Sequence, residues 1–150
     1  MREHLFLFAN LAGICPNVIE IRVEEMIKNL ILSDVVNFKA GILSDGYKRR
    51  LTLGMALIGK PKFVILDDPL TGVDPASTLK VLKTIRDETN GSTLLMCTQQ
   101  IENAMAIASR LAIMHKGKFV ALGTIGEIMN LHGTGYTIEL QTNVAALVET

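Results

Sequence analysis

Residues 63–66 form a continuously apolar run, Phe-Val-Ile-Leu, that is followed at once by Asp67 and Asp68. An apolar run without alternation is typical of a parallel strand that is covered on both faces. Strand and helix patterns alternate from residue 62 onward, whereas the residues before that point have helical patterns. This order predicts an α/β layer structure with a helical part in front of it.

Three helices are predicted in the first sixty residues. Pro16-Asn17 separates the first two, with Asn17 as a candidate N-cap, and the third covers residues 44–59. Apolar side chains recur with helical spacing in the first two helices. The residues that share an apolar face are Leu5, Phe8 and Ala12 in the first helix, and Val23, Ile27, Leu30 and Ile31 in the second.

Turn residues divide the rest of the chain. Asp74-Pro75 predicts a helix start, because Asp is a good N-cap and Pro is favoured at the first helical position. Asn90-Gly91 and Lys116-Gly117 are predicted turns, the second within a β-hairpin. The predicted elements are helices at 74–88, 102–109 and 125–131, and strands at 93–97, 111–114, 119–122 and 136–140.

Composition narrows the classes of function. The formal net charge is zero over 150 residues, so no long-range field attracts nucleic acid or an anionic membrane. Cys15 and Cys97 form no metal or disulfide pattern, which indicates a reducing, cytosol-facing setting. No signal-peptide pattern or transmembrane segment is predicted, since the apolar runs fall short of the roughly 20 residues that span a bilayer. Any connection to a membrane is therefore expected to depend on other polypeptide.

Ser44-Asp45-Gly46 opens the third predicted helix and has two interpretations. A serine before a helix is most often an N-cap, which stabilises the helix by about 1 kcal/mol. A hydroxyl, a glycine and unpaired backbone N–H groups at a helix start also suit a phosphate. On these residues alone the cap is the favoured interpretation. The basic residues that follow are predicted to form a solvated face: Lys48, Arg49 and Arg50.

Asp67 and Asp68 come directly after a buried strand. Ligands of open α/β sheets gather at the carboxyl ends of strands, so paired carboxylates there suggest a magnesium ligand and a base that orients water. The alternative is a polar loop after a strand, which is common. Asp74 likewise has a sufficient role as an N-cap, and residues 98–100 either contact the same nucleotide or form a loop.

The order and spacing of these segments resemble one family. The sequence LSDGYKRRLTLGMALIGKPKFVILDDPLTGVDPAS is similar to the joined signature, Walker B and D-loop segments of ATP-binding cassette (ABC) domains. Residues 43–47 stand in place of the LSGGQ signature, 63–67 in place of the Walker B strand, and 72–74 in place of the D-loop. Asp68 stands at the catalytic glutamate and Gln99 at the switch histidine. The tail from residue 109 resembles the A subfamily of eukaryotic ABC transporters.

The resemblance implies an ATPase domain that works with ATP and Mg²⁺. Its implied partners are a second ABC ATPase domain, paired head to tail, and transporter membrane domains, with a lipid as cargo and no nucleic acid. The signature of one domain would then face the ATP that the Walker A loop of the other holds. The implied site residues are Ser44, Asp45, Gly46, Tyr47 and Asp74 around ATP, Asp67 on Mg²⁺, and Asp68 and Gln99 in catalysis.

Four substitutions separate the chain from the family pattern. Asp68 is one methylene shorter than glutamate, and Gln99 cannot carry the positive charge of histidine. Asp45 replaces a glycine; a carboxylate about 4 Å from a phosphate costs about 4 kcal/mol per charge pair at an effective dielectric constant of 20. We therefore expect Asp45 to point away from the phosphate. Tyr47 replaces glutamine and is the mildest of the four changes.

One motif of the family is absent. The sequence contains no G-x-x-x-x-G-K-[ST] phosphate loop, which would lie before residue 1. The expected fold is an incomplete P-loop NTPase, with a helical and signature part at 1–60 and the C-terminal part of the core at 61–150. We expect the isolated chain to bind ATP weakly or not at all, and to leave sheet edges and apolar faces uncovered.

Three functions stay open at this point, and with them the question whether the chain is an active enzyme. The first is a transport ATPase domain at the cytoplasmic face of a membrane, with a slowly hydrolysing regulatory site. The second is a catalytically inactive truncated remnant, or a gene-model fragment. The third and weaker one is a soluble ABC protein acting on ribosomes, which the neutral charge disfavours because RNA-facing proteins usually carry a basic excess.

Overall fold

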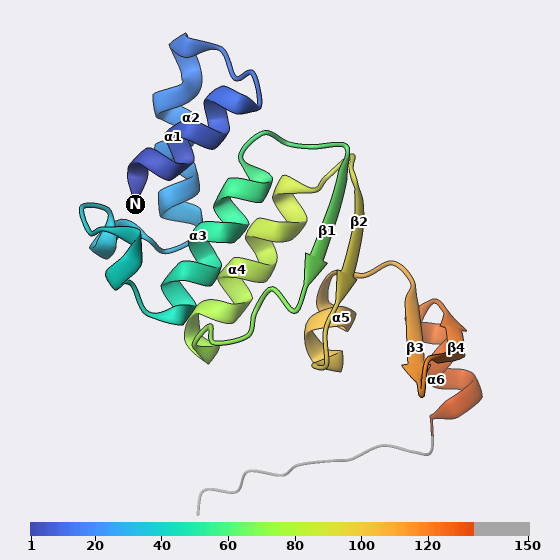
Figure 1. Cartoon of the computed structure of the whole chain (residues 1–150). Helices are drawn as coiled ribbons and strands as arrows, with labels where there is room; N and C mark the ends of the chain where they lie inside the picture. Colours follow the sequence, from blue (N-terminus) through green and yellow to red (C-terminus); the bar gives the residue numbers. More distant parts are fainter. Residues whose placement is uncertain (134–150) are drawn as a thin grey trace, which may run out of the picture. The chain divides into compact units, whose positions relative to one another are not determined.

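The computed structural model of the chain describes residues 1–133 and divides into two compact units (Figure 1). The first unit is Met1–Ala108 and the second begins at Ser109. The predicted strand at 136–140 lies outside the described residues. The predicted boundary near residue 60 stays a prediction. The first unit contains the helices before residue 60 together with the first two strands.

The chain begins with two helices, α1 (Arg2–Leu11) and α2 (Pro16–Asn29). Pro16 occupies the first position of α2, so its N-cap is Cys15 and the predicted cap at Asn17 is wrong. Proline suits this position because its missing N–H would have no partner inside the helix.

The predicted apolar face is only partly correct in α1 and largely correct in α2. Leu5 is buried, but the buried residue one turn later is Ala9, whereas Phe8 is 39% exposed and Ala12 is exposed. In α2, Val23 and Ile27 are buried as predicted, and Leu30 is buried directly after the helix. Ile31 lies beyond the helix and has a positive φ of 55°.

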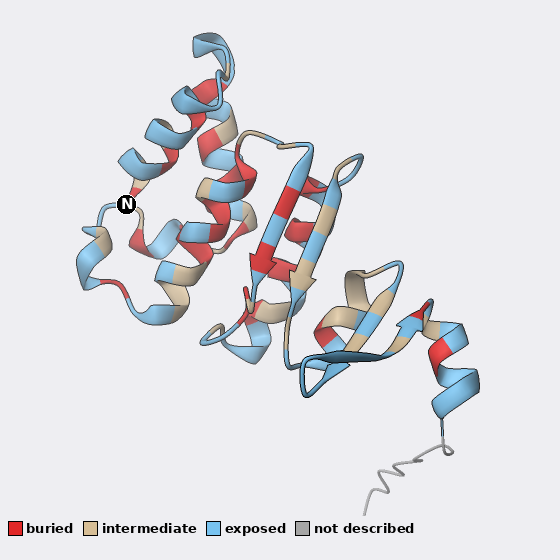
Figure 2. Ribbon diagram, turned by 45° about the vertical axis from the view of Figure 1, so that its right-hand side comes forward, coloured by how far each residue is buried: buried red, intermediate tan, exposed pale blue. Residues whose placement is uncertain are grey.

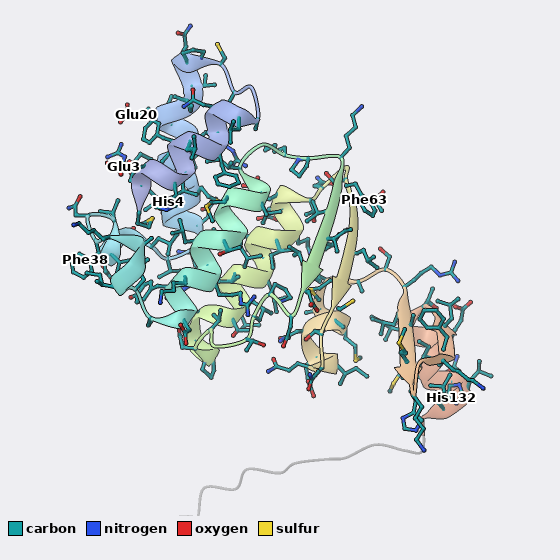
Figure 3. All side chains as sticks on the ribbon, in the orientation of Figure 1. Glu3, His4, Glu20, Phe38, Phe63 and His132 are labelled. Carbon is teal, nitrogen blue, oxygen red and sulfur yellow. The ribbon has the colours of Figure 1, made fainter. Side chains whose placement is uncertain are left out.

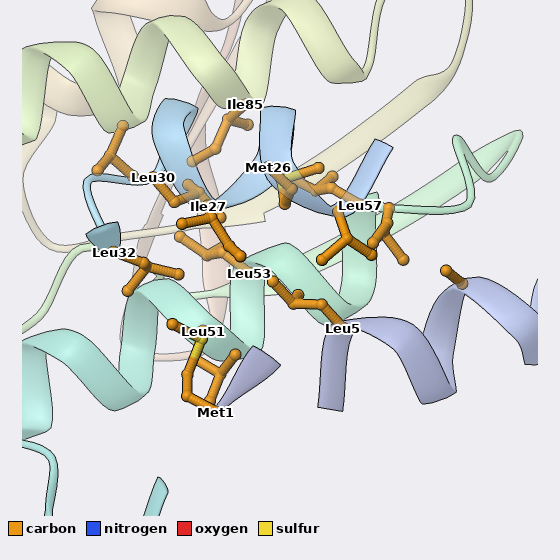
Figure 4. Close-up of a cluster of buried hydrophobic side chains, with 14 of the residues drawn as sticks. Met1, Leu5, Met26, Ile27, Leu30, Leu32, Leu51, Leu53, Leu57 and Ile85 are labelled. Atoms are coloured by element: carbon orange, nitrogen blue, oxygen red, sulfur yellow. The ribbon is translucent and has the colours of Figure 1, made fainter. Parts of the chain in front are cut away.

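Two short 3₁₀ turns, η1 (Ser33–Val35) and η2 (Ala40–Ile42), connect α2 to α3 (Asp45–Leu57). The helix ends two residues before the predicted end at residue 59. Its buried leucines pack in one hydrophobic core with side chains of α1, α2 and α4 (Pro75–Glu88), as the close-up in Figure 4 shows. The labelled members of this core include Leu5, Met26, Leu53, Leu57 and Ile85.

Strand β1 (Phe63–Asp67) pairs in parallel with β2 (Thr93–Cys97), and α4 lies between them in the chain. The parallel pairing confirms the predicted α/β class. The predicted cover on both faces is wrong for the described residues. Val64 and Leu66 are buried, whereas Ile65 on the other face is 64% exposed and Leu95 of β2 is 52% exposed (Figure 2). Phe63, labelled in Figure 3, alternates with the buried residues in the same way and is 55% exposed.

Helix α5 (Ile101–Ile107) follows β2 and ends two residues before the predicted end at residue 109. The second unit contains β3 (Leu111–His115), β4 (Lys118–Gly123) and α6 (Ile125–His132). The predicted hairpin is confirmed: β3 and β4 are antiparallel, and Lys116 and Gly117 have φ of 47° and 74°. Positive φ at both residues is the geometry of the two-residue turn that matches strand twist.

Among residues 1–133, no helix combines the length and the apolar character needed to cross a bilayer.

Candidate functional site

Ser44 stands at the N-cap position of α3, with φ of −64° and ψ of 162°. Its side chain makes no capping hydrogen bond with the helix, although the backbone has the conformation of a cap. The residue is exposed, so within the described part of the chain its hydroxyl is available to a ligand. Ser44 therefore occupies the N-cap position, as the favoured interpretation predicted, but its side chain does not make the capping hydrogen bond.

The first turn of α3 presses directly on the loop after β1. A Cβ atom on Gly46 would overlap the carbonyl oxygen of Gly72 and would lie 3.4 Å from its carbonyl carbon. Gly72 itself has φ of 77°, which favours glycine. Gly46 and Gly72, which are 26 positions apart in the sequence, therefore lie with their backbones in contact.

Asp45 points outward beside these residues. Its side chain is 97% exposed, and Oδ1 lies 3.8 Å from Nζ of Lys48. Such an exposed pair adds little stability, but the ammonium group partly offsets the carboxylate charge at the start of the helix. The expectation that Asp45 points away from a phosphate stays a prediction.

Arg50 corrects the predicted basic face, because only Lys48 is exposed and Arg50 is buried with 5% exposure. Its guanidinium lies 4.4 Å from the centre of the Tyr47 ring, and NH1 donates to the carbonyl of Ile31 at 3.0 Å. Nε is buried and has no hydrogen-bond partner among the described residues. Arg50 therefore ties α3 to the segment just after α2, and the Tyr47 ring lies against its guanidinium.

Asp74 caps α4, as predicted: Oδ1 accepts the N–H of Ser77 at 2.8 Å. Hydrogen bonding to Ser77 lowers the pKa of Asp74 below its ordinary value of 3.8, and the positive charge of Arg50 adds a smaller effect in the same direction. The side chain is already engaged within its own helix. A role of Asp74 in signalling across a domain interface stays a prediction.

The low pKa gives Asp74 a testable dependence on pH. Because the folded state prefers the carboxylate, its stabilising contribution is full above pH 3.8 and is lost as the pH falls through the folded-state pKa. We expect Asp74→Asn, which keeps an N-capping oxygen, to lose less melting temperature than wild type between pH 5 and pH 3, roughly the titration range of a carboxyl group. Asp74→Ala should melt lower than both at neutral pH. Circular dichroism melts at stepped pH measure this, and parallel curves for wild type and Asp74→Asn would contradict it.

Asp67 and Asp68 differ in environment, although they are neighbours. Asp67 ends β1, opposite Cys97, and its exposed carboxylate receives no hydrogen bond from the described residues. Asp68 has φ of 45°, and its N–H donates to the carbonyl of Cys97 at 2.8 Å. The Asp68 carboxylate accepts hydrogen bonds from Thr71 Oγ1 and, at 3.4 Å, from Thr98 Oγ1.

The loop after β2 reaches the same edge of the sheet. Thr98 contacts Asp68 and also accepts the N–H of Gln100 at 3.1 Å. Gln99 is exposed between them. The carboxyl ends of β1 and β2 thus bring Asp67, Asp68 and Thr98 together, as expected for a parallel sheet. The sequence interpretation missed Thr71 and the burial of Arg50; the spacing of Arg50 from Tyr47 and Leu57 on one helix face was the available signal.

Comparison with known proteins identifies this arrangement. The family model described as ABC transporter matches residues 2–71. ABC transporter A family member 9 of Arabidopsis thaliana is 37% identical over 134 residues, which are 89% of this chain and 14% of that protein. The chain belongs to the ABC transporter family. The assignment of the Ser44 turn to the family's signature segment, and of the loop that carries Gly72 to its D-loop, stays a prediction.

Animal members of the A subfamily match over a similar range. The retinal-specific phospholipid-transporting ATPase ABCA4 of Bos taurus is 38% identical over 141 residues, which are 93% of this chain and 6% of that protein. The glucosylceramide transporter ABCA12 of Homo sapiens is 33% identical over 141 residues, which are 93% of this chain and 5% of that protein. The predicted A-subfamily resemblance is confirmed, and the chain spans 14% or less of each of these relatives.

A solved structure of an ATP-binding subunit of an ABC transporter shares the fold. The two structures align with a TM-score of 0.75 at 25% identity. The alignment covers 88% of this chain and 55% of the solved chain. The predicted partial P-loop NTPase fold is therefore confirmed.

The residues of this ABC domain fit a nucleotide and a metal ion in part. The N–H groups of Asp45, Gly46 and Tyr47 have no intrahelical acceptor, because the first turn of any helix leaves them free, and Ser44 precedes them with a hydroxyl that makes no capping bond. Within residues 1–133 there is no cluster of three metal-ligating side chains. Mg²⁺ usually takes one or two carboxylates together with phosphates and waters, so a single carboxylate such as that of Asp67 would be enough from this sheet edge.

Proposed function

We propose that this chain contributes the signature half of an ATP site that is shared with a second ABC ATPase domain. Ser44 and Gly46 would contact the γ-phosphate of ATP held by the phosphate loop of that partner. The observation that carries the proposal is the Ser44 hydroxyl, which stands at a helix start without bonding to the helix. The contact between Gly46 and Gly72 supports it, since it links the phosphate-binding turn to the loop that ends at Asp74.

The electrostatics of the α3 start favour an anion. The helix dipole places partial positive charge at the N-terminus, and three backbone N–H groups point the same way. Asp45 opposes this, but its carboxylate is 97% exposed and lies 3.8 Å from the Lys48 ammonium group. We infer that Tyr47 and Asp45 border the phosphate while Ser44 and Gly46 contact it.

We infer a separate role in hydrolysis for the edge formed by β1 and β2. Asp67 would ligate Mg²⁺ through its exposed carboxylate, Asp68 would orient the attacking water, and Gln99 would hydrogen-bond a phosphate oxygen. When bound, Mg²⁺ supplies charge neutralisation for the phosphates. A positioned general base raises the rate by roughly 10²–10⁴, and we infer that the short side chain of Asp68 gives only part of this increase. The proposal is therefore slow, regulatory hydrolysis.

A second candidate is a catalytically inactive domain, whether a remnant or a gene-model fragment. It is favoured by the engagement of the Asp68 carboxylate with two hydroxyl groups. A ribosomal role draws no support from the balanced charge of the chain.

The relatives suggest the cargo and the setting. Two A-subfamily relatives are named as transporters of phospholipid and of glucosylceramide. We infer that this domain works at the cytoplasmic face of a membrane, coupled to transporter membrane domains, and that the cargo is a lipid.

Equilibrium binding of a fluorescent ATP analogue tests the proposed site. The chain alone should show a Kd above about 1 mM, and binding should tighten when an ABC domain with an intact phosphate loop is added. In that mixture Ser44→Ala should weaken binding about 10- to 150-fold, the effect of losing about 1.5–3 kcal/mol from a hydrogen bond to a charged group.

Ser33→Ala is the matched control, because Ser33 is also exposed but lies at η1. Micromolar affinity of the chain alone, or equal binding by Ser44→Ala and wild type in the mixture, would contradict the proposal.

A further inference from the structure

We propose that Thr71 is a positioning residue that fixes the Asp68 carboxylate; the proposal rests on the proposed role of Asp68 in hydrolysis. The hydroxyl of Thr71 donates to Oδ2 of Asp68, and the N–H of Thr71 donates to the Asp68 carbonyl at 3.3 Å. The two residues thus form a closed turn that is bonded through both backbone and side chain. A carboxylate held this way has one orientation before any ligand binds.

The backbone at Asp68 is held from the other side by the sheet. The Asp68 N–H continues the pairing of β1 with β2 through the carbonyl of Cys97, at 2.8 Å. The left-handed φ of 45° then turns the chain sharply away from the strand. Pro69 and Leu70 follow as buried residues, so packing fixes the turn between the strand and Thr71. A non-glycine residue in this conformation persists only where its surroundings determine it.

A second hydroxyl reaches the other carboxylate oxygen. Thr98 Oγ1 lies 3.4 Å from Oδ1 of Asp68, a longer and weaker contact than that of Thr71. The Asp68 carboxylate therefore bridges the loop after β1 and the loop after β2, which carries Gln99. A longer glutamate at this position would extend the carboxylate beyond the turn, so the short side chain and Thr71 are complementary.

This geometry assigns Thr71 an effect on turnover through Asp68 alone. Among the described residues, the Thr71 hydroxyl donates to Asp68 and makes no hydrogen bond to the start of α3. We therefore expect it to influence the catalytic step and to leave nucleotide affinity unchanged. Loss of the hydroxyl frees the Asp68 side chain to rotate, and fewer molecules then present the carboxylate in one orientation.

Hydrogen exchange on the full chain tests the contact without nucleotide. Thr71→Val removes the hydroxyl at nearly constant volume, and we expect it to speed exchange of the Asp68 and Val73 amides by about 10-fold. Thr71→Ser keeps the hydroxyl and should stay within about 3-fold of wild type. Thr78→Val is the control, since among the described residues the Thr78 hydroxyl bonds the carbonyl of Asp74 and not a carboxylate. In an Asp68→Ala background Thr71→Val should add nothing, and an unchanged effect there would overturn the proposal.

Steady-state turnover by the assembled ATPase that contains this chain tests the consequence. We expect Thr71→Val to lower kcat about 10-fold with KM within about 2-fold, and Thr71→Ser to restore kcat. A rise in KM with unchanged kcat would overturn the positioning role. A wild-type assembly without turnover would count against the proposed function instead, and the exchange result would still decide whether Thr71 holds Asp68.

Discussion

Arg22→Ala is expected to lower the free energy of unfolding of the first unit by about 3–5 kcal/mol, the cost of leaving one partner of a buried ion pair alone. Arg22 of α2 is 13% exposed and Glu88 at the end of α4 is 7% exposed. NH1 donates to Oε1 of Glu88 at 2.9 Å, and NH2 donates to Oε2. The pair is bidentate, which is the strong geometry for arginine and carboxylate.

The same guanidinium also binds the end of a third helix. Nε donates to the carbonyl of Ile58 at 3.1 Å, just beyond the last residue of α3. Carbonyl groups at a helix C-terminus have no partners inside the helix and attract cations. Arg22 therefore joins α2, α3 and α4 at one point, and its removal leaves both a buried carboxylate and an unpaired helix end.

Arg2 supplies the matched control. It also bridges two helices, with NH2 at 2.6 Å from carboxylate oxygens of Glu20 and Glu24, but these side chains are 39%, 70% and 50% exposed. Arg2→Ala should cost at most about 1 kcal/mol, the upper range for exposed pairs. The double variant Arg22→Met/Glu88→Leu should recover most of the loss. Urea unfolding followed by circular dichroism measures all of these, and similar losses for Arg22→Ala and Arg2→Ala would refute the expectation.

Gly46→Ala is expected to destabilise the first unit by about 1–3 kcal/mol, the usual cost of overpacking. Alanine in a helix is ordinarily more stable than glycine by about 1 kcal/mol, so the sign of the result is informative. Here the added methyl group would overlap the carbonyl oxygen of Gly72, which belongs to backbone and cannot rotate aside like a flexible side chain. The loop that carries Gly72 must then shift.

Gly41→Ala in η2 is the comparison, because a Cβ on Gly41 has no atom within 4 Å and its φ is not positive. We expect that substitution to be neutral or to stabilise by up to about 1 kcal/mol. Urea unfolding gives the free energies, and NMR shifts of the Gly72 amide report displacement of the loop. A stabilised Gly46→Ala variant with an unmoved Gly72 resonance would show that the two backbones are not in contact.

The sequence predicted the order of elements well, and the errors have local causes. Continuous apolar character at residues 63–66 correctly indicated a parallel strand, which the structure extends to Asp67. It also predicted cover on both faces, and there it is wrong, because Ile65 is exposed. Apolar character shows which faces suit burial, not which partner is present to cover them. The cap at Asn17 failed because the preceding proline already occupied the first helical position, which moves the cap to Cys15.

The candidate site was predictable as a set of segments and less so as a set of contacts. The carboxyl ends of β1 and β2 brought Asp68 and Thr98 together as a parallel sheet requires. The hydrogen bond from Thr71 to Asp68 depends on the left-handed backbone conformation of Asp68. The sequence pattern did not predict this conformation. Arg50 is buried despite its charge. Its position follows from helix periodicity, and the Tyr47 ring and the backbone carbonyls of Leu30 and Ile31, just after α2, supply its partners.

No side chain separates Gly46 of α3 from Gly72, so the helix and the loop that carries Gly72 cannot move closer together. Side chains can change rotamer and absorb a small movement, but two backbones in contact must move together. We therefore expect a tilt of α3 that moves Ser44 to displace Gly72 as well, and Asp74, which accepts a hydrogen bond from the first turn of α4, to follow. Such a coupling would need no hydrogen bond between α3 and the loop.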